Sequence, residues 1–469
     1  MRFKILTSIM FVVLTGSAVF AQDAVQVKKT ISYNDYITEI EKSLPELKSN
    51  EMDILSAENR VKKAKSGGDI SLNAGGNAYS NTQYSGINDK GDVKGYDYYA
   101  GLSKTITSTG TTLSGTYNYS KNDYNNFSST PDYTAYEPSV TAKISQPLLY
   151  NFLGKVDRYS ENNANMQLEI AKYQLQENNK SVLNAYKKLY FQWIMYNDII
   201  KNLDEAISNS NILKEQVRRK VNAGLADNDD FQGSVASVLS YENQRREYQT
   251  ALKNISNQIS IYLNIAAGVP DVKIFNEYYR KADESGLAEL DFKNTTSAKI
   301  MDLTMKNYAY SKGVYENRLL PEFNVFAGIT KKDIAESQTY GVKDTDYSVG
   351  FEFKYSLENN SAESSLKDVE IQIRSLEYEY TAAQNSYRKQ LLGYIESSNG
   401  IAEQLANKEK SLQALESKLV TERKKYSQAR LNLSYIITTE NSITSERNNI
   451  LALKNQLIGN YIDYTDLVK

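Results

Sequence analysis

The chain of 469 residues contains no cysteine and no histidine. Without cysteine it can form no disulfide framework. Without either residue it also lacks thiol nucleophiles, imidazole bases and nearly all of the side chains that bind transition metals. Carboxylate chemistry stays open, but no motif points to it. We therefore expect a protein that is not an enzyme and that uses no cofactor or metal ion.

An excess of charge of either sign is also missing. Lysine and arginine number 55, aspartate and glutamate number 57, and no basic block stands out along the chain. A nucleic-acid partner requires a concentration of cations that neutralises phosphates. The balanced charge therefore argues against such a partner.

Long hydrophobic runs are scarce, and beyond the N-terminus none approaches the roughly 20 apolar residues of a membrane-spanning helix. At the N-terminus, Arg2 and Lys4 lead into an apolar stretch at residues 5–13, and Ala21 occupies a usual cleavage position. This pattern is typical of a secretory signal peptide, so we expect residues 1–21 to be removed. A retained membrane anchor is the alternative, although the apolar stretch is short for one.

Proline is also scarce, and the chain alternates between two kinds of sequence. Residues 68–150 and 321–357 are rich in glycine, serine, threonine, tyrosine and asparagine and alternate with a period of two. Residues 155–265 and 360–467 contain no proline and show the periodicity of long helices. The order helix, strands, long helices therefore occurs twice.

Matching blocks in the same order support an internal duplication of this plan. The aligned blocks begin at Ile70 and Phe323, at Ser139 and Ser348, and at Gly224 and Arg430. The first copy carries additional residues between its outer strands. After the signal peptide we expect a first repeat over 22–265, an irregular linker or equatorial segment over 266–297 and a second repeat over 298–469.

The predicted strands alternate between apolar and polar residues. In the second copy Val349, Phe351 and Phe353 alternate with polar residues, and in the first copy Val140 and Ile144 do the same. Each segment is close to the ~9–11 residues of a tilted membrane strand. A half-buried strand of a soluble sandwich alternates in the same way, so the strands alone leave both possibilities open.

An additional hairpin is indicated between the outer strands of the first copy. Alternating residues flank a turn at residues 108–110, with Leu102 before it and Leu113 after it. A glycine-containing turn between alternating runs is a hairpin signal. The sequence leaves open whether residues 95–121 add strands to a barrel or form an external loop.

The helical segments repeat apolar residues every seven positions. One series runs from Leu168 to Leu203 and another from Leu366 to Ile401. Seven-residue spacing keeps an apolar seam facing a partner helix and predicts coiled-coil packing. Each segment holds about 70 residues and would reach roughly 100 Å if continuous, several times the thickness of a bilayer. With antiparallel returns, such helices suit a stalk that spans the periplasm.

Several motifs occur in the order and spacing of a known family. Residues 144–149, Ile-Ser-Gln-Pro-Leu-Leu, end a predicted strand, and residues 318–323, Arg-Leu-Leu-Pro-Glu-Phe, lead a helix into a strand. The most specific segment is Val-Asn-Ala-Gly-Leu-Ala at 221–226, followed by Asp230 and Phe231. On these motifs and the duplicated plan, the chain resembles the TolC family of outer-membrane efflux proteins over nearly its full length.

The resemblance implies a mixed α/β membrane protein, in which a trimeric transmembrane β-barrel is continued by a long antiparallel α-helical coiled-coil tunnel. It implies a homotrimer in the outer membrane that extends into the periplasm and contacts membrane lipid, a periplasmic adaptor and an inner-membrane pump or ABC exporter. The implied function is an exit duct that passively conducts small toxic molecules to the exterior. A type I secretion duct for proteins or peptides is the alternative, and a secreted coiled-coil structural or adhesive protein is a remote one.

In the family, helix turns at the periplasmic tip contact the adaptor, and acidic side chains ring the constriction of the tunnel. Carried over by position, the tip contacts are Ala223, Gly224, Leu225 and Ala226, and in the second copy Ala429, Arg430, Leu431 and Asn432. The constriction candidates are Asp227, Asp229, Asp230, Ile436, Thr439 and Glu440. Arg430 departs from the family because a glycine is usual at its place. Since Ile436 and Thr439 stand where aspartates are usual, we expect a narrowest ring that is apolar or hydroxyl-lined and only weakly selective for cations.

Overall fold

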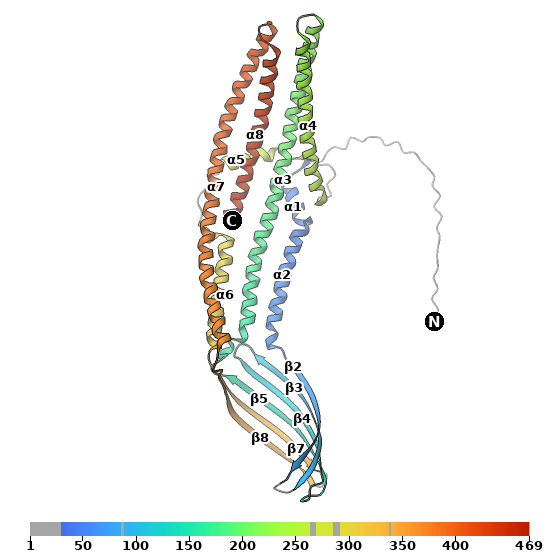
Figure 1. The fold of residues 1–469 in the computed structure, drawn as a ribbon, viewed down its shortest axis with the longest axis vertical. Helices are drawn as coiled ribbons and strands as arrows, with labels where there is room; N and C mark the ends of the chain where they lie inside the picture. The colour runs from blue at the N-terminus through green and yellow to red at the C-terminus, as the bar shows by residue number, and fades with distance from the viewer. Residues whose placement is uncertain (1–29, 86–88, 263–268, 285–290, 337–338, 469) are drawn as a thin grey trace, which may run out of the picture.

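The protein is an elongated molecule in which a curved β-sheet forms one end and long helices run away from it (Figure 1). The computed structural model describes residues 30–85, 89–262, 269–284, 291–336 and 339–468. The predicted signal peptide at residues 1–21 lies outside the described residues.

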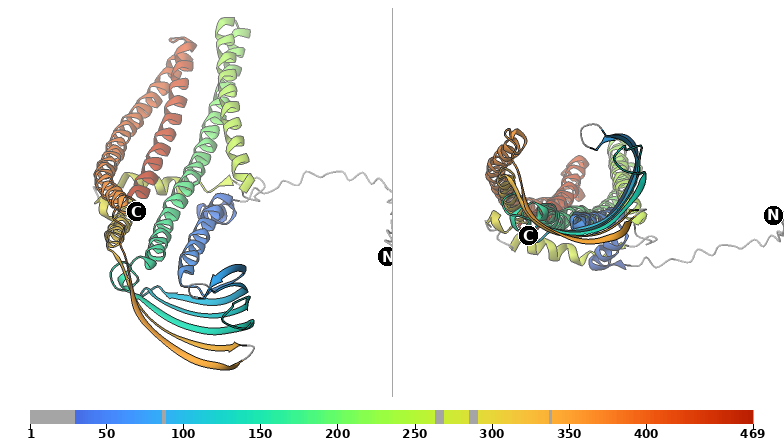
Figure 2. Two further views of the ribbon diagram at one scale, coloured as in Figure 1. Left: turned by 60° about the horizontal axis from the view of Figure 1, so that its bottom comes forward. Right: turned by 90° about the horizontal axis from the view of Figure 1, so that it is seen from below.

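Six antiparallel strands form the main sheet, and their order in space is their order in the chain. The strands are β2 (Ser71–Tyr84), β3 (Lys90–Ile106), β4 (Thr111–Asn125), β5 (Tyr133–Pro147), β7 (Glu322–Glu336) and β8 (Thr339–Lys354). Residues 95–121, whose place the sequence left open, fall in β3 and β4, so this hairpin is part of the sheet. Viewed from below, the sheet bends into an arc (Figure 2).

Each strand presents one apolar and one polar face, as the alternation predicts. Leu102, Val140 and Phe351 lie on the apolar face and are more than half exposed. The opposite face carries hydroxyl and amide groups, such as the hydroxyls of Thr141 and Thr330, whose oxygens lie 3.1 Å apart. An exposed apolar surface that extends over a whole sheet marks a site of contact with lipid or with a partner.

Two helices run the length of the stalk: α3 (Asp157–Asn222) has 66 residues and α7 (Asn360–Ser427) has 68. At about 1.5 Å per residue each spans roughly 100 Å, which confirms the predicted length. Shorter helices cover them in turn, α2 and α6 near the sheet and α4 and α8 beyond (Figure 1). These are α1 (Tyr33–Ser43), α2 (Pro45–Ala64), α4 (Asn228–Tyr262), α5 (Lys273–Glu284), α6 (Thr296–Arg318) and α8 (Leu433–Val468), with short 3₁₀ turns at Lys65–Gly68, Phe152–Gly154 and Phe292–Asn294. No helix in the described part of the chain is both long and apolar enough to cross a membrane.

Buried positions on α7 follow the predicted seven-residue repeat. Tyr387 and Ile401 of the predicted series are buried and its other members are half-buried, while Leu391 and Leu405 are buried beside them. On α3, Leu203 is buried, whereas the other members of its series are half-buried. The repeat is therefore confirmed only in part along both helices.

The predicted irregular linker at 266–297 contains regular structure in its described part. Its strand β6 (Val269–Pro270) pairs in parallel with β1 (Thr30–Ile31), and helix α5 follows. Phe275 of α5 is buried in the main hydrophobic cluster. Because apolar burial and strand pairing order this segment, the expectation of an irregular linker is wrong there.

The largest hydrophobic cluster lies near the middle of the stalk, where α1, α4, α5 and α8 meet α3. Tyr190 of α3 is fully buried in it. Its hydroxyl donates to the carbonyl oxygen of Ile31 at 2.7 Å and accepts from the N–H of Asp271 at 3.0 Å. Burial raises the pKa of Tyr190 to about 12, so the phenol stays protonated and remains a donor. This one side chain therefore ties the β1–β6 pair to the stalk.

Replacing Tyr190 by phenylalanine tests that connection. The variant keeps the ring but loses the hydrogen bonds of the hydroxyl to the carbonyl oxygen of Ile31 and from the N–H of Asp271, two groups that still bond each other at 3.2 Å, so it costs about 1 kcal/mol of stability. We expect Tyr190→Phe to lower the thermal unfolding midpoint, whereas the matched change Tyr378→Phe, at a side chain that is 78% exposed, leaves it unchanged. Equal midpoints for the two variants would contradict the assigned role.

Candidate functional site

Both helix turns that the sequence singled out lie at the end of the stalk farthest from the sheet (Figure 1). One joins α3 to α4 and the other joins α7 to α8. In the first turn Ala223, Gly224 and Leu225 are exposed and Ala226 is half-buried. In the second turn Ala429, Arg430 and Asn432 are exposed and Leu431 is half-buried. The structure therefore brings the predicted tip residues together on an accessible surface.

The two turns are built in the same way. Gly224 has a left-handed backbone with φ of 68°, and the next N–H, that of Leu225, donates to the carbonyl oxygen of Lys220 at 2.8 Å. This is the hydrogen bond that ends many helices at a left-handed residue. At the second turn, Ala429 takes the left-handed conformation, with φ of 56°, and the N–H of Arg430 donates to the carbonyl oxygen of Lys425 at 2.9 Å.

The alignment of Arg430 with Gly224 is therefore wrong by one residue. The left-handed position, not the identity of the neighbouring leucines, defines which residues correspond. Ala429 is the counterpart of Gly224, and Arg430 is the counterpart of Leu225. An arginine thus stands where the first turn exposes a leucine, and the second tip is more strongly cationic than the first.

The six constriction candidates fall into two groups. Asp227 and Asp229 are exposed and Asp230 is half-buried, all at the start of α4, where carboxylates are stabilised by the helix dipole. The other three lie inside the protomer on α8: Ile436 and Thr439 are 1% exposed and Glu440 is 8% exposed. Within the described ranges no group of carboxylates is placed to hold a metal ion. The role of either group in a constriction stays a prediction.

Glu440 is buried because it has a partner. Its carboxylate lies 2.7 Å from the guanidinium of Arg423 on α7. Nearby, the ammonium of Lys220 on α3 lies 3.6 Å from the centre of the Tyr426 ring on α7, which joins the two helix pairs close to their tips. Burial raises the pKa of Tyr426, and the carboxylate of Asp230 raises it further.

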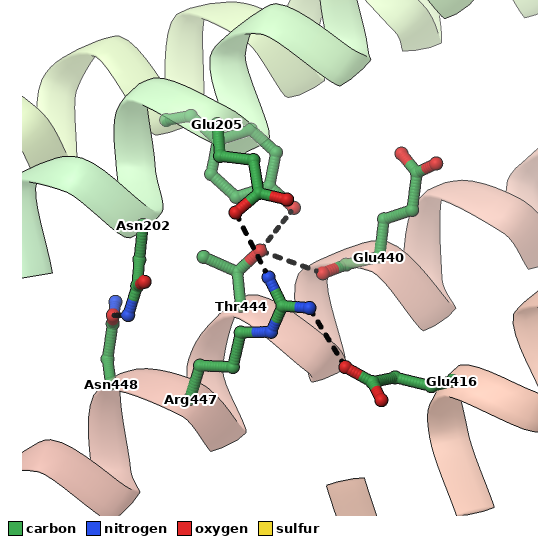
Figure 3. Close-up of polar contacts among 8 residues, drawn as sticks. Asn202, Glu205, Glu416, Glu440, Thr444, Arg447 and Asn448 are labelled. Atoms are coloured by element: carbon green, nitrogen blue, oxygen red, sulfur yellow. Dashed lines mark hydrogen bonds and ion pairs between the residues drawn. The ribbon is translucent and has the colours of Figure 1, made fainter. Parts of the chain in front are cut away.

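Below the tips, a cavity of about 270 Å³ separates the two helix pairs. Arg447 of α8 crosses it, donating to Glu205 of α3 at 3.3 Å and to Glu416 of α7 at 2.8 Å (Figure 3). Thr444, one turn away, donates to the carbonyl oxygen of Glu440 at 3.0 Å and lies 3.5 Å from the hydroxyl of Tyr241 on α4. A single guanidinium therefore connects three helices across the cavity.

Further polar contacts hold the same region. The amides of Asn202 on α3 and Asn448 on α8 are 3.3 Å apart (Figure 3). Lys408 of α7 lies 2.8 Å from Glu446 of α8, and this ammonium lowers the pKa of Glu446. Sequence reasoning missed all of these residues because it followed the apolar repeat, and the partners of a charged side chain leave no periodic signal.

Exchanging glycine and alanine between the two turns gives a matched test of their geometry. A left-handed residue with a side chain costs about 1–2 kcal/mol relative to glycine. We expect Gly224→Ala to speed hydrogen exchange at the end of α3 about fivefold, and Ala429→Gly to slow it at the end of α7 by a similar factor. Open space surrounds the position of a Cβ on Gly224, so no clash complicates the first variant. Shifts in the same direction at both turns would contradict the assignment.

No family model matches the chain, and no curated protein matches it by sequence. Solved structures do match it. CusC, which forms a transmembrane channel, superposes with a TM-score of 0.66 at 12% identity, over 92% of this chain and 91% of its own. VceC, an outer-membrane protein of Vibrio cholerae, superposes with a TM-score of 0.63 at 13% identity, over 93% of this chain and 95% of its own. The outer-membrane channel CmeC of Campylobacter jejuni superposes with a TM-score of 0.62 at 11% identity, over 93% of this chain and 85% of its own. At these identities the likeness establishes the architecture, and the chain has the fold of the TolC-like outer-membrane channels.

Proposed function

We propose that this protein is a member of the TolC family that acts as the outer-membrane exit duct of a tripartite efflux system. In this role it is a homotrimer in the outer membrane that extends into the periplasm. It passively conducts small toxic molecules that an inner-membrane pump and a periplasmic adaptor deliver to its tip. One observation carries the proposal: a sheet with an exposed apolar face continues directly into helices of 66 and 68 residues.

Each half of that observation excludes another kind of protein. A secreted coiled-coil structural protein has no need of a sheet whose apolar side chains are more than half exposed, because such a surface promotes aggregation in water. A protein confined to the outer membrane has no need of helices that reach roughly 100 Å beyond the sheet. A duct that joins the outer membrane to a partner in the inner membrane requires both parts.

The trimer follows from the free edges of the sheet. Strands β2 and β8 each have a neighbour on one side only within the described part of the chain. An open edge leaves unpaired backbone N–H and C=O groups, which lipid cannot satisfy. Association of several copies into one closed barrel removes these edges, and the resemblance to the TolC family implies a trimer as the form of that association.

The tips are the proposed docking and closing region. The exposed turns around Gly224 and Ala429 are the proposed contacts for the adaptor, and Asp227, Asp229 and Asp230 are the proposed acidic constriction. Ile436, Thr439 and Glu440 are buried against their own protomer, so they would reach a tunnel only after the helix pairs rearrange. The buried hydroxyl oxygens of Ser210 and Thr439 have no hydrogen-bond partner, which suits a region with a second arrangement.

The cargo depends on the pump rather than on this chain, so a type I secretion duct would use the same fold. Contacts with the pump and the adaptor are expected at the tips, and contacts with lipid at the apolar face of the sheet.

A planar-bilayer recording tests the function. Detergent-extracted particles from the outer membrane should have the mass of three chains and should insert and conduct, and a low conductance would indicate closed tips. The control is the same preparation from cells that lack the gene. A soluble elongated particle that never conducts would overturn the proposal.

Arg447 gives a second prediction for the same recording. Arg447→Gln removes both ion pairs across the cavity, and exposed pairs of this kind contribute about 1 kcal/mol or less each. We expect a conductance or open fraction several-fold above that of the native protein, since α3 is then held less tightly to α7 and α8. The matched control is Arg218→Gln, which removes a pair with Glu215 within α3 and leaves the conductance unchanged. Equal effects of the two variants would show that Arg447 does not restrain the tips.

A further inference from the structure

The geometry of the sheet points to a pore that the β3–β4 hairpin widens. We infer that three copies of the chain close an eighteen-stranded barrel, six strands from each, in which β8 of one copy pairs antiparallel with β2 of the next. This inference rests on the proposed function. It adds the interface, its register and the width of the pore.

The first step is to measure the slip, which is the offset along the strand direction that accumulates from β2 to β8 within one chain. A continuous row of paired residues crosses the sheet from Leu72 on β2 to Tyr347 on β8, through Leu102, Gly115, Ala142 and Ile329. Toward the helices, β2 extends one residue beyond this row, to Ser71. In the same direction β8 extends seven residues beyond it, to Lys354. The strands therefore slip by six residues across one chain.

This slip has the size that a closed barrel needs. Six residues of ~3.4 Å over six strands spaced ~4.8 Å apart give a tilt of about 35°, within the range of natural barrels. The slip must also be even, because an odd value would place the apolar side chains of β8 beside the polar side chains of β2. Slips of four or ten residues give about 25° or 50° and fall outside that range, whereas a slip of eight gives about 43° and falls inside it. Of six and eight, only six brings the helix ends of β8 and β2 to the same level.

A slip of six residues defines the register at the joint, which is the proposed pairing of β8 of one copy with β2 of the next. The last residue of β8, Lys354, then lies opposite the first residue of β2, Ser71, so both strands end at the same level. On the apolar side Phe351 lies opposite Ala74, and Tyr347 lies opposite Ala78. The pairs follow from counting along both strands from their helix ends.

Side-chain sizes are complementary in this register. The apolar face of β8 is made of large residues that are highly exposed in one chain, with Tyr347 at 80%, Val349 at 87% and Phe351 at 71%. The residues opposite them on β2 are small: Ala78, Gly76 and Ala74. Large side chains beside small ones on neighbouring strands pack without clash and cover the exposed backbone. A second copy of this chain is therefore the occupant that fits the edge.

The β3–β4 hairpin is part of the sheet, and hence of the barrel wall, rather than a loop packed against it. At its turn the amide of Gln146 on β5 donates to the carbonyl oxygen of Thr109 at 3.0 Å, and the hydroxyl of Thr111 donates back to Gln146 at 2.5 Å. Gly154, in the loop before α3, passes so close that a Cβ would lie 1.9 Å from the carbonyl oxygen of Thr107. These contacts hold the turn at the junction of sheet and stalk, between β2 and β5.

The consequence is a wider pore in which the added strands contribute a mostly uncharged polar lining. Eighteen strands at this tilt give a backbone radius of about 17 Å, against about 11 Å for the twelve strands that would remain without the hairpin. Toward the polar side the hairpin contributes hydroxyl and amide groups such as those of Ser114, Thr116 and Asn118. Its one carboxylate on that side, Asp97, accepts a hydrogen bond from Ser120 at 2.6 Å.

Disulfide cross-linking in outer membranes tests the joint, and the absence of cysteine from the chain leaves no background. The matched pairs are Ala74→Cys with Phe351→Cys and Ala78→Cys with Tyr347→Cys. The control pair, Ala74→Cys with Tyr347→Cys, is out of register by four residues, about 13 Å. After oxidation we expect covalent dimers and trimers on a non-reducing denaturing gel from both matched pairs and monomers from the control.

A third pair tests the position of the hairpin. Ala74 and Val140 lie in one row with two strands between them, so cysteines at both positions should remain free thiols. A disulfide within the chain would show that β3 and β4 have left the wall, and would overturn the inference.

The conductance of each reduced variant is recorded beside the gels to separate two kinds of failure. A conducting trimer whose matched pairs do not cross-link, or whose control pair does, overturns the β8–β2 register and leaves the exit-duct function standing. A native chain that neither trimerises nor conducts overturns the proposed function itself. Single-cysteine variants that conduct normally show that the substitutions are tolerated.

Discussion

The packing of two very long helices is the constraint on which the rest of the stalk depends. Isolated helices gain little stability from propensity alone, so α3 and α7 need an apolar partner along their whole length. Two shorter helices in succession supply it for each: α2 then α4 along α3, and α6 then α8 along α7 (Figure 1). The change of partner leaves the middle of the stalk open, and there α1, α5 and the β1–β6 pair fill the gap around Tyr190. The belt of extra elements is thus a consequence of helix length.

Burial is unevenly divided along this stalk. The middle is held by a large apolar cluster, whereas the tips are joined by a few charged and polar contacts, among them those of Arg447 and Lys220. Apolar packing in a closely filled core resists local opening, while isolated ion pairs near solvent contribute little. The protein therefore combines a rigid middle with ends that separate at low cost, which is the division that a closable duct needs.

At the other end, the sheet meets a different requirement. In the proposed barrel its apolar face points outward and its polar face points inward, and the strands slip by about one residue per strand. Slip, tilt and strand number are linked in any closed barrel, so the hairpin that adds strands also determines the width. In that proposal the register within one chain determines how the next copy pairs with it.

The sequence by itself determined the features that repeat locally. A two-residue alternation placed β5 and β8, a seven-residue repeat and the lack of proline placed α3 and α7, and turn residues located both tips. It could not determine pairings between distant segments, because periodicity reports which face of an element is apolar and not what covers that face. Only the tertiary structure decided that residues 95–121 join the sheet, that α5 orders the linker, that Ala429 rather than Arg430 takes the left-handed position, and that Ile436, Thr439 and Glu440 lie inside the protomer. The proposed duplication and the domain boundaries stay predictions of the sequence.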